Sequence, residues 1–239
     1  MRVLFITTSY NNPVDTGGQT GGWLEDLAVP YYVFMDAGAE VTIASPNGGA
    51  ILLAPQNQSI IIVTRSARHL LTEAMAMTFL SRSILLKDAK ADDFDVVFLS
   101  DGYGALWDLA GNRTVKKLLE AFNNSGKPIA AVGHGVAGLL SVRDGGGRLL
   151  VKGKRLTAFS NSEERLTGLT GAVPFLLADT LISLGALYTN TTDYLCYVVA
   201  DDNIITGQNP ASSEEVAKRV VAWYSFIKKP NLVVKMQNV

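Results

Sequence analysis

KPIAAVGHGVAGLL, residues 127–140, is the stretch that decides the fold. Its apolar run predicts a buried strand over 128–132, which stops at Gly-His-Gly before a helix predicted over 135–142. Many α/β enzymes mount a nucleophile at a strand-to-helix corner of this kind. Here the corner residue is Gly133, which has no side chain. The corner is therefore either a plain turn or a place where a catalytic group was lost or never needed.

The same alternation of strands and helices extends outward from this corner. Pro30 is expected to kink the first helix or to mark its true start. Near-continuous apolar strands separated by helices predict an α/β protein whose mostly parallel sheet is covered on both faces. The remaining predicted elements are strands at 2–8, 40–46 and 95–100, helices at 22–38 and 113–126, a hairpin and strand within 144–160, helices around 163–169 and 174–185, a hairpin at 197–207 and a final helix at 212–227.

The pattern contains no linker and no repeat, so we expect a single domain over 1–239. Its least regular part is 47–92, which we interpret as an insertion or cap. Within it, 48–66 resembles a hairpin or extended segment and 67–89 a helix. This insertion could close over a ligand site.

Composition narrows the classes of function. Lys+Arg 21 against Asp+Glu 22 gives a net charge of −1, which leaves no bulk basic charge to attract nucleic acid or an anionic membrane. No apolar run is long enough to span a membrane. One cysteine and two histidines exclude an internal disulfide and argue against a metal site. We therefore expect an intracellular protein without nucleic-acid or membrane partners and without a metal.

Polar residues gather where parallel strands end, and ligands of such folds bind outside those carboxyl ends. Glu25 follows the first strand, Asp101 the strand at 95–100, and His134 the corner. Two close carboxylates push one pKa upward, which suits general acid–base work. The same three residues also fit plainer roles as a helix cap, a turn residue and a packed histidine. The missing side chain at Gly133 is expected to leave room for a water or a small ligand group.

Several segments together resemble the ThiJ/PfpI superfamily, in its glyoxalase/deglycase and stress-chaperone branch, which is class I glutamine-amidotransferase-like. They include WLEDLAVPYYVFMDAGAEVTIASPNGG, GKPIAAVGHGVAGLL and VKGKRLTAFSNSEE. The resemblance runs from residue 2 to about residue 225. It implies a flavodoxin-like three-layer sandwich in a cytoplasmic, cofactor-free homodimer.

The resemblance also implies roles at the corner. The branch carries Ala-Val-Cys-His-Gly there, with a carboxylate from the first helix bonded to the cysteine sulfur. Carried over, the nucleophile position is Gly133, its neighbour is His134 and the helix carboxylate is Glu25. Glu164 falls where some members orient the histidine.

Other positions follow from the same resemblance. Backbone N–H groups of Gly102 and His134 fall where the family forms its oxyanion hole. We expect Tyr103, Trp107 and Tyr197 to line the ligand side, with Tyr197 at the place of a family histidine. Cys196 takes the place of a proline and is expected to be a small buried residue.

Two interpretations of function remain open at this point. Family chemistry begins with thiolate attack on a carbonyl, which glycine cannot supply. The first interpretation is therefore a non-catalytic, chaperone-like or ligand-binding stress protein without standard glyoxalase or deglycase activity. The second is a cysteine-independent hydratase, lyase or isomerase that acts on a small carbonyl or acid compound through Glu25, Asp101 and His134.

Overall fold

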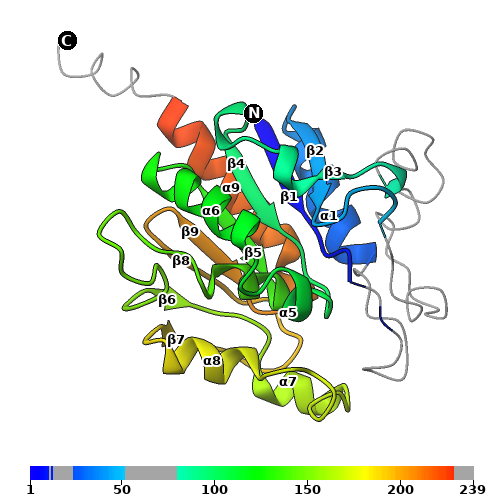
Figure 1. Ribbon diagram of the computed structural model, residues 1–239, viewed down its shortest axis with the longest axis vertical. Helices are drawn as coiled ribbons and strands as arrows, with labels where there is room; N and C mark the ends of the chain where they lie inside the picture. Colours follow the sequence, from blue (N-terminus) through cyan, green and yellow to red (C-terminus); the bar gives the residue numbers. More distant parts are fainter. Residues whose placement is uncertain (11, 13–23, 52–79, 229–239) are drawn as a thin grey trace.

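The computed structural model describes residues 1–10, 12, 24–51 and 80–228. Within these ranges one central sheet contains seven strands, in the spatial order β3-β2-β1-β4-β5-β9-β8 (Figure 1). Neighbouring strands are parallel except β8 and β9, which form the predicted antiparallel hairpin. The strands are β1 Arg2–Ile6, β2 Glu40–Ser45, β3 Ile84–Leu85, β4 Val96–Leu99, β5 Ile129–Val132, β8 Val198–Asp201 and β9 Ile204–Gly207. The mostly parallel, flavodoxin-like sandwich is confirmed.

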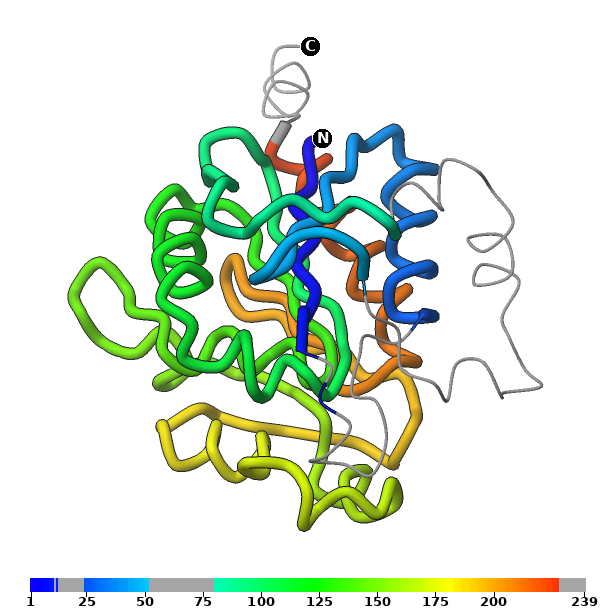
Figure 2. Tube along the Cα trace, turned by 45° about the vertical axis from the view of Figure 1, so that its right-hand side comes forward, coloured from blue at the N-terminus to red at the C-terminus, as the bar shows by residue number. Residues whose placement is uncertain are grey.

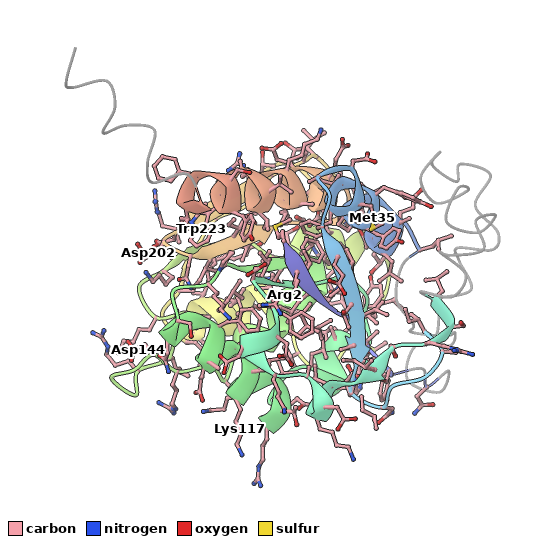
Figure 3. The ribbon with its side chains drawn as sticks, turned by 90° about the horizontal axis from the view of Figure 1, so that it is seen from above. Arg2, Met35, Lys117, Asp144, Asp202 and Trp223 are labelled. Atoms are coloured by element: carbon pink, nitrogen blue, oxygen red, sulfur yellow. The ribbon has the colours of Figure 1, made fainter. Side chains whose placement is uncertain are left out.

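Helices cover both faces of the sheet. α1 and α9 lie side by side on one face and α6 lies on the other, with Met35 and Lys117 on opposite sides in Figure 3. The helices are α1 Leu24–Asp36, α5 Ala105–Asp108, α6 Arg113–Asn124, α7 Asn161–Leu166, α8 Leu177–Ser183 and α9 Ser213–Lys228. The described part of the chain also contains the short 3₁₀ segments η1 Leu86–Asp88, η2 Ala91–Asp93, η3 Gly133–Leu139 and η4 Pro210–Ser212. Within the described ranges, every helix is too short or too polar to span a lipid bilayer.

Apolar spacing explains how these helices dock. α6 begins after Asn112, whose side chain accepts the N–H of Thr114, and it buries residues at helical spacing. The buried residues are Val115, Leu118, Leu119 and Phe122. On the other face, Phe34 of α1 places its ring 5.6 Å from Phe98 of β4.

Three sequence predictions differ from the structure. In place of the helix predicted at 135–142 the structure has the 3₁₀ segment η3. The cause is close packing against β4: a Cβ added at Gly135 would meet the Ser100 carbonyl, and one added at Gly138 would meet the Leu99 side chain. Pro30 lies inside α1, so of its two predicted roles the start of the helix is wrong and the kink stays a prediction. The end of the helix predicted at 67–89 is strand β3, paired with β2. Residues 52–79 of the predicted insertion lie outside the described residues, so the insertion stays a prediction.

A smaller layer lies beyond the end of the sheet toward which β1 runs (Figures 1 and 2). It consists of α7, α8 and a parallel pair of short strands, β6 Arg155–Leu156 and β7 Leu187–Tyr188. β4 and β5 are neighbours in register, with Leu99 opposite Ala131. Asp101 and Gly133 therefore emerge side by side, and α7 faces them.

Candidate active site

Gly133 ends β5 at a sharp corner, with a φ of +53°. A residue with a side chain is strained in this left-handed conformation. Space is also short, since a Cβ added at Gly133 would overlap the carboxylate of Asp101. The room expected beside Gly133 is therefore not empty. The carboxylate of Asp101 fills it, because the loop after β4 turns this side chain toward the corner.

Three hydrogen bonds fix this carboxylate. Its Oδ1 accepts the backbone N–H groups of Gly102 and His134 at 2.7 Å each, and it lies 3.0 Å from Nδ1 of His134. The first two donors are the pair that the resemblance assigns to an oxyanion hole. That predicted hole is thus occupied by a carboxylate of the chain itself. Among the described residues these three bonds all go to Oδ1.

His134 is buried and held on every side. Its Nε2 lies 2.9 Å from Oε2 of Glu164, and its ring lies 4.4 Å from the rings of Tyr103 and Phe159. Burial alone lowers the pKa of His134, but hydrogen bonds and charges from Asp101 and Glu164 outweigh it and raise the pKa to about 9. His134 is therefore an imidazolium at neutral pH, with both nitrogens engaged by carboxylates.

Glu164 reaches His134 because α7 begins in a fixed place. Ser160 caps the helix in a capping box with Glu163: its hydroxyl accepts the Glu163 N–H at 3.1 Å, and Oε2 of Glu163 accepts the Ser160 N–H at 2.9 Å. Glu163 also accepts the backbone N–H of Tyr194 and the amide of Asn209 at 2.8 Å each. Sequence reasoning missed Glu163, although Ser160 three residues before it is a capping-box signal.

The fully buried carboxylate of α1 is Asp26, which follows the predicted Glu25 in the chain. Asp26 is fully buried, whereas Glu25 is half-buried at the start of the helix. Burial first, and then the charge of Asp101, raise the pKa of Asp26 well above its ordinary value. Its Oδ1 accepts the hydroxyl of Ser213 at 2.8 Å, and its buried Oδ2 has no hydrogen-bond partner among the described residues. The signal was present, since Asp26 lies four residues before the buried Pro30 on the core stripe.

The aromatic side chains divide differently from the prediction. Tyr103 packs on His134, and its predicted contact with a ligand stays a prediction. Tyr197 lies outside the cluster, with its hydroxyl donating to Thr189 Oγ1 at 3.1 Å, and Trp107 stacks on Tyr10 with ring centroids 5.0 Å apart. The tyrosine near the cluster is Tyr194, whose ring lies 6.3 Å from Phe159.

Cys196 is exposed, whereas the sequence analysis predicted a buried residue. Among the described residues, no group of three or more His, Cys, Asp or Glu side chains is arranged to hold a metal ion. The cluster can instead move protons: it joins the carboxylate of Asp101, an imidazolium at His134 and the buried carboxyl of Asp26, whose pKa is raised.

A parallel sheet with helices on both faces and a strained glycine corner after β5 defines a flavodoxin-like α/β protein with a strand-to-helix elbow. Comparison with known sequences is consistent with this class, since the model of the DJ-1/PfpI family matches residues 24–223. The chain belongs to the DJ-1/PfpI family.

Relatives cover nearly the whole chain. Glutathione-independent glyoxalase hsp3101 of Schizosaccharomyces pombe is 29% identical over 247 residues, spanning 95% of this chain and 98% of that protein. The solved glyoxalase III of Candida albicans is 26% identical with a TM-score of 0.83, and covers 93% of this chain and 96% of its own. Rapid Encystment Protein 24 KDa of Francisella tularensis is 32% identical with a TM-score of 0.87, over 92% and 97%.

These findings correct the expectation that the chain lacks standard glyoxalase activity, because relatives over nearly its whole length are named glutathione-independent glyoxalases. That expectation treated the corner at Gly133 as empty, whereas the carboxylate of Asp101 lies there. The predicted homodimer, the chaperone role and the cytoplasmic location stay predictions.

Proposed function

We propose that this protein is a glutathione-independent glyoxalase that converts a 2-oxoaldehyde into a 2-hydroxy acid with carboxylates in place of a thiolate. One observation carries the proposal: the carboxylate of Asp101 lies where a side chain at residue 133 would begin. The names of the relatives support the reaction class, and the three hydrogen bonds on Asp101 support its role in the chemistry.

The reaction does not require a covalent intermediate. In water a 2-oxoaldehyde adds one water to become R–CO–CH(OH)₂, which is an isomer of the product R–CH(OH)–COOH. Conversion removes the proton from C1, giving the enetriol R–C(OH)=C(OH)₂ with a proton on the former carbonyl oxygen, and then places a proton on C2 while a C1 hydroxyl gives up its own. Atoms and electrons balance without an oxidant, so the protein needs a base and an acid on either side of the substrate.

Asp101 and Asp26 fit these two roles. Oδ2 of Asp101 is the base, because Oδ1 is already engaged by His134 and two backbone N–H groups. Asp26 is the acid, since burial and the charge of Asp101 raise its pKa well above the ordinary value. His134 and Glu164 are positioning residues, because both nitrogens of the imidazole are already engaged.

The test is the conversion of methylglyoxal to lactate by the purified chain. Asp101→Asn and Asp26→Asn keep the shape of each side chain but remove its acid–base function, and each should lower kcat by about 10²-fold or more. The matched control is Cys196→Ser, which removes the only sulfur that a thiol mechanism could use and should leave kcat unchanged.

Iodoacetamide treatment of the native protein provides a second control. Alkylation of the exposed Cys196 should not alter turnover. Loss of activity in Cys196→Ser, or full activity in Asp101→Asn, would overturn the carboxylate mechanism. Absence of lactate formation by the native protein would overturn the proposed activity itself.

A further inference from the structure

Asp108, the last residue of α5, carries a partly buried carboxylate that contacts the chain after β1. Its Oδ1 accepts the hydroxyl of Thr8 at 2.8 Å, and its Oδ2 accepts the backbone N–H of Ser9 at 2.6 Å. The Thr8 oxygen in turn accepts the backbone N–H of Tyr10 at 2.9 Å. Asp108 therefore holds three consecutive residues beyond the end of β1, and the mechanism proposed above does not use it.

Two close contacts join the same two segments. A Cβ added at Gly104 would overlap the Thr8 hydroxyl and would lie 2.9 Å from the carbonyl oxygen of Tyr10, so a side chain at this position would push the segments apart. Trp107 stacks on Tyr10, with the planes of the two rings 2° apart. The start of the 104–108 segment and the chain after β1 are therefore one packed unit, in which Asp108 supplies the hydrogen bonds.

This packed segment leads directly to Asp101. Ala105, the first residue of α5, donates its backbone N–H to the carbonyl of Gly102 at 3.0 Å. On the other side of Asp101, Ser100 donates its backbone N–H to the carbonyl of Ile6 in β1, also at 3.0 Å. The loop that carries Asp101 is thus held at both ends, by β1 and by the residues that follow it.

The direction of the Asp101 side chain depends on how this loop is held. Gly102 follows it with a φ of +143°, and the conformational freedom of glycine means that the local sequence alone does not fix this turn. The N–H groups of Gly102 and His134 lie only 2.7 Å from Oδ1 of Asp101, so a small displacement of the loop would lengthen both hydrogen bonds.

The ionised form of Asp108 is costly in its place. Burial raises the pKa of Asp108 to about 6, although hydrogen bonds from Ser9 and Thr8 lower it. Ionisation at neutral pH therefore disfavours the folded state. A carboxylate kept at such a cost is explained by the segments that it joins rather than by a gain in stability.

We propose that Asp108 is a positioning residue, which fastens the loop 101–108 to the end of β1 and so keeps the carboxylate of Asp101 at the Gly133 corner and against His134. This inference rests on the proposed function, because it takes Asp101 as the base of the reaction. Asp108 itself does not touch the substrate and acts through Thr8 and the backbone between residues 101 and 108.

Asp108→Asn tests the inference, because an amide nitrogen cannot accept the hydrogen bond that a carboxylate oxygen accepts. We expect kcat for methylglyoxal to fall about tenfold or more with KM nearly unchanged, since a displaced base weakens the transition state and not substrate binding. The NMR titration midpoint of His134 should fall from about 9 by about one pH unit, because against burial the hydrogen bond and charge of Asp101 do most to raise this pKa. The substitution also removes a costly charge, so the variant should still fold.

A matched pair of neighbouring threonines separates positioning from folding. Thr8→Val removes the hydroxyl that donates to Asp108 and should lower kcat and the His134 midpoint in the same way, whereas Thr8→Ser should recover most of both. Thr7→Val is the control, because the buried Thr7 hydroxyl has no hydrogen-bond partner among the described residues. It should leave both quantities at their native values.

The His134 midpoint also separates this inference from the proposed function, because it is measured without turnover. If the native chain forms no lactate, a lowered midpoint in Asp108→Asn and Thr8→Val, with Thr7→Val unchanged, still supports the inference. A native midpoint in both variants overturns it, with or without lactate formation. A loss of stability in urea with kcat and the midpoint unchanged would also overturn it, since the contacts would then be merely structural.

Discussion

At the scale of single residues, Gly133 and Asp101 form an interdependent pair. One lacks a side chain in a left-handed conformation, and the carboxylate of the other occupies the space that a side chain would need. Replacing Gly133 therefore affects two energies, the backbone strain at residue 133 and the hydrogen bonds of Asp101. These two contributions can be separated experimentally.

We predict that Gly133→Ala destabilises the native protein by about 3 kcal/mol, but by only about 1 kcal/mol when Asp101→Ala is also present. In the double variant only the backbone strain remains, because the overlapping carboxylate is gone. Urea unfolding of the four proteins of this cycle measures the coupling. Gly126→Ala is the matched control for strain alone, since Gly126 has a φ of +63° and nothing within 4 Å of an added Cβ.

Additive effects of the two substitutions on the free energy of unfolding would contradict the overlap.

The same reasoning applies to Gly133→Cys, which cannot place its sulfur at the corner while Asp101 is present. We expect thiol-dependent turnover only when Asp101 is also replaced by a small residue such as glycine.

At the scale of elements, α7 depends on Glu163 more than on its N-cap. Glu163 is fully buried and accepts three donors, from Ser160, Tyr194 and Asn209. We predict that Glu163→Ala lowers the free energy of unfolding by about 3 kcal/mol or more, because three buried donors lose their acceptor. For comparison, Ser160→Ala should lower the free energy of unfolding by about 1 kcal/mol.

Denaturant midpoints at unchanged m-values would measure both effects. The hydrogen bond between His134 and Glu164 provides a second readout, because Glu164 follows Glu163 in the same helix. If the two variants prove equally stable, the capping box alone holds α7 and the contacts to Tyr194 and Asn209 contribute little.

The elements also show what the sequence could predict. The strands at β1, β2, β4 and β5 and the late hairpin were predictable, because continuous apolar runs between helical patterns leave few alternatives. The 3₁₀ segment η3 was not predictable, because its close approach to β4 overrides the helical pattern of the residues after Gly133. Periodicity is a property of the sequence, whereas close approach is a property of the folded structure.

The site was predicted in part for the same reason. Asp101 and His134 come together because the ends of β4 and β5 meet at one edge of a parallel sheet, and Glu164 reaches His134 from α7. The direction in which Asp101 points, and the difference between Glu25 and Asp26, depend on side-chain packing that motif spacing does not encode. Tyr197 was named because the resemblance places it at a family histidine, whereas the positive φ of Tyr194 leaves no clear signal in the sequence.

At the scale of the whole molecule, the cluster around His134 links folding to pH. The pKa of His134 is raised from 6.5 to about 9, so between these values the folded chain holds a proton that the unfolded chain has lost. The free energy of unfolding should therefore fall as pH rises from about 6.5 to about 9, by up to about 3 kcal/mol. Asp26 also makes the free energy of unfolding fall as pH rises, because its raised pKa means that its ionisation destabilises the folded state.

Imidazole titration by NMR tests this directly, because the chain has only two histidines. One resonance should titrate near pH 9, and His69→Gln identifies it as His134 by removing the other. Glu164→Gln should lower that midpoint and flatten the decline in stability, since one of the two acids that raise the pKa is then neutral. A His134 midpoint near 6.5 would contradict the ionised cluster.

The carboxylate held by Gly102 and His134 has one more consequence, for the release of product. It acts as a tethered acid, present at the two N–H groups at a high effective concentration. A free 2-hydroxy acid would have to displace it to use those donors, and would bring a second negative charge beside Asp101. End-product inhibition should therefore be weak, so that conversion can proceed nearly to completion while the acid accumulates around the enzyme.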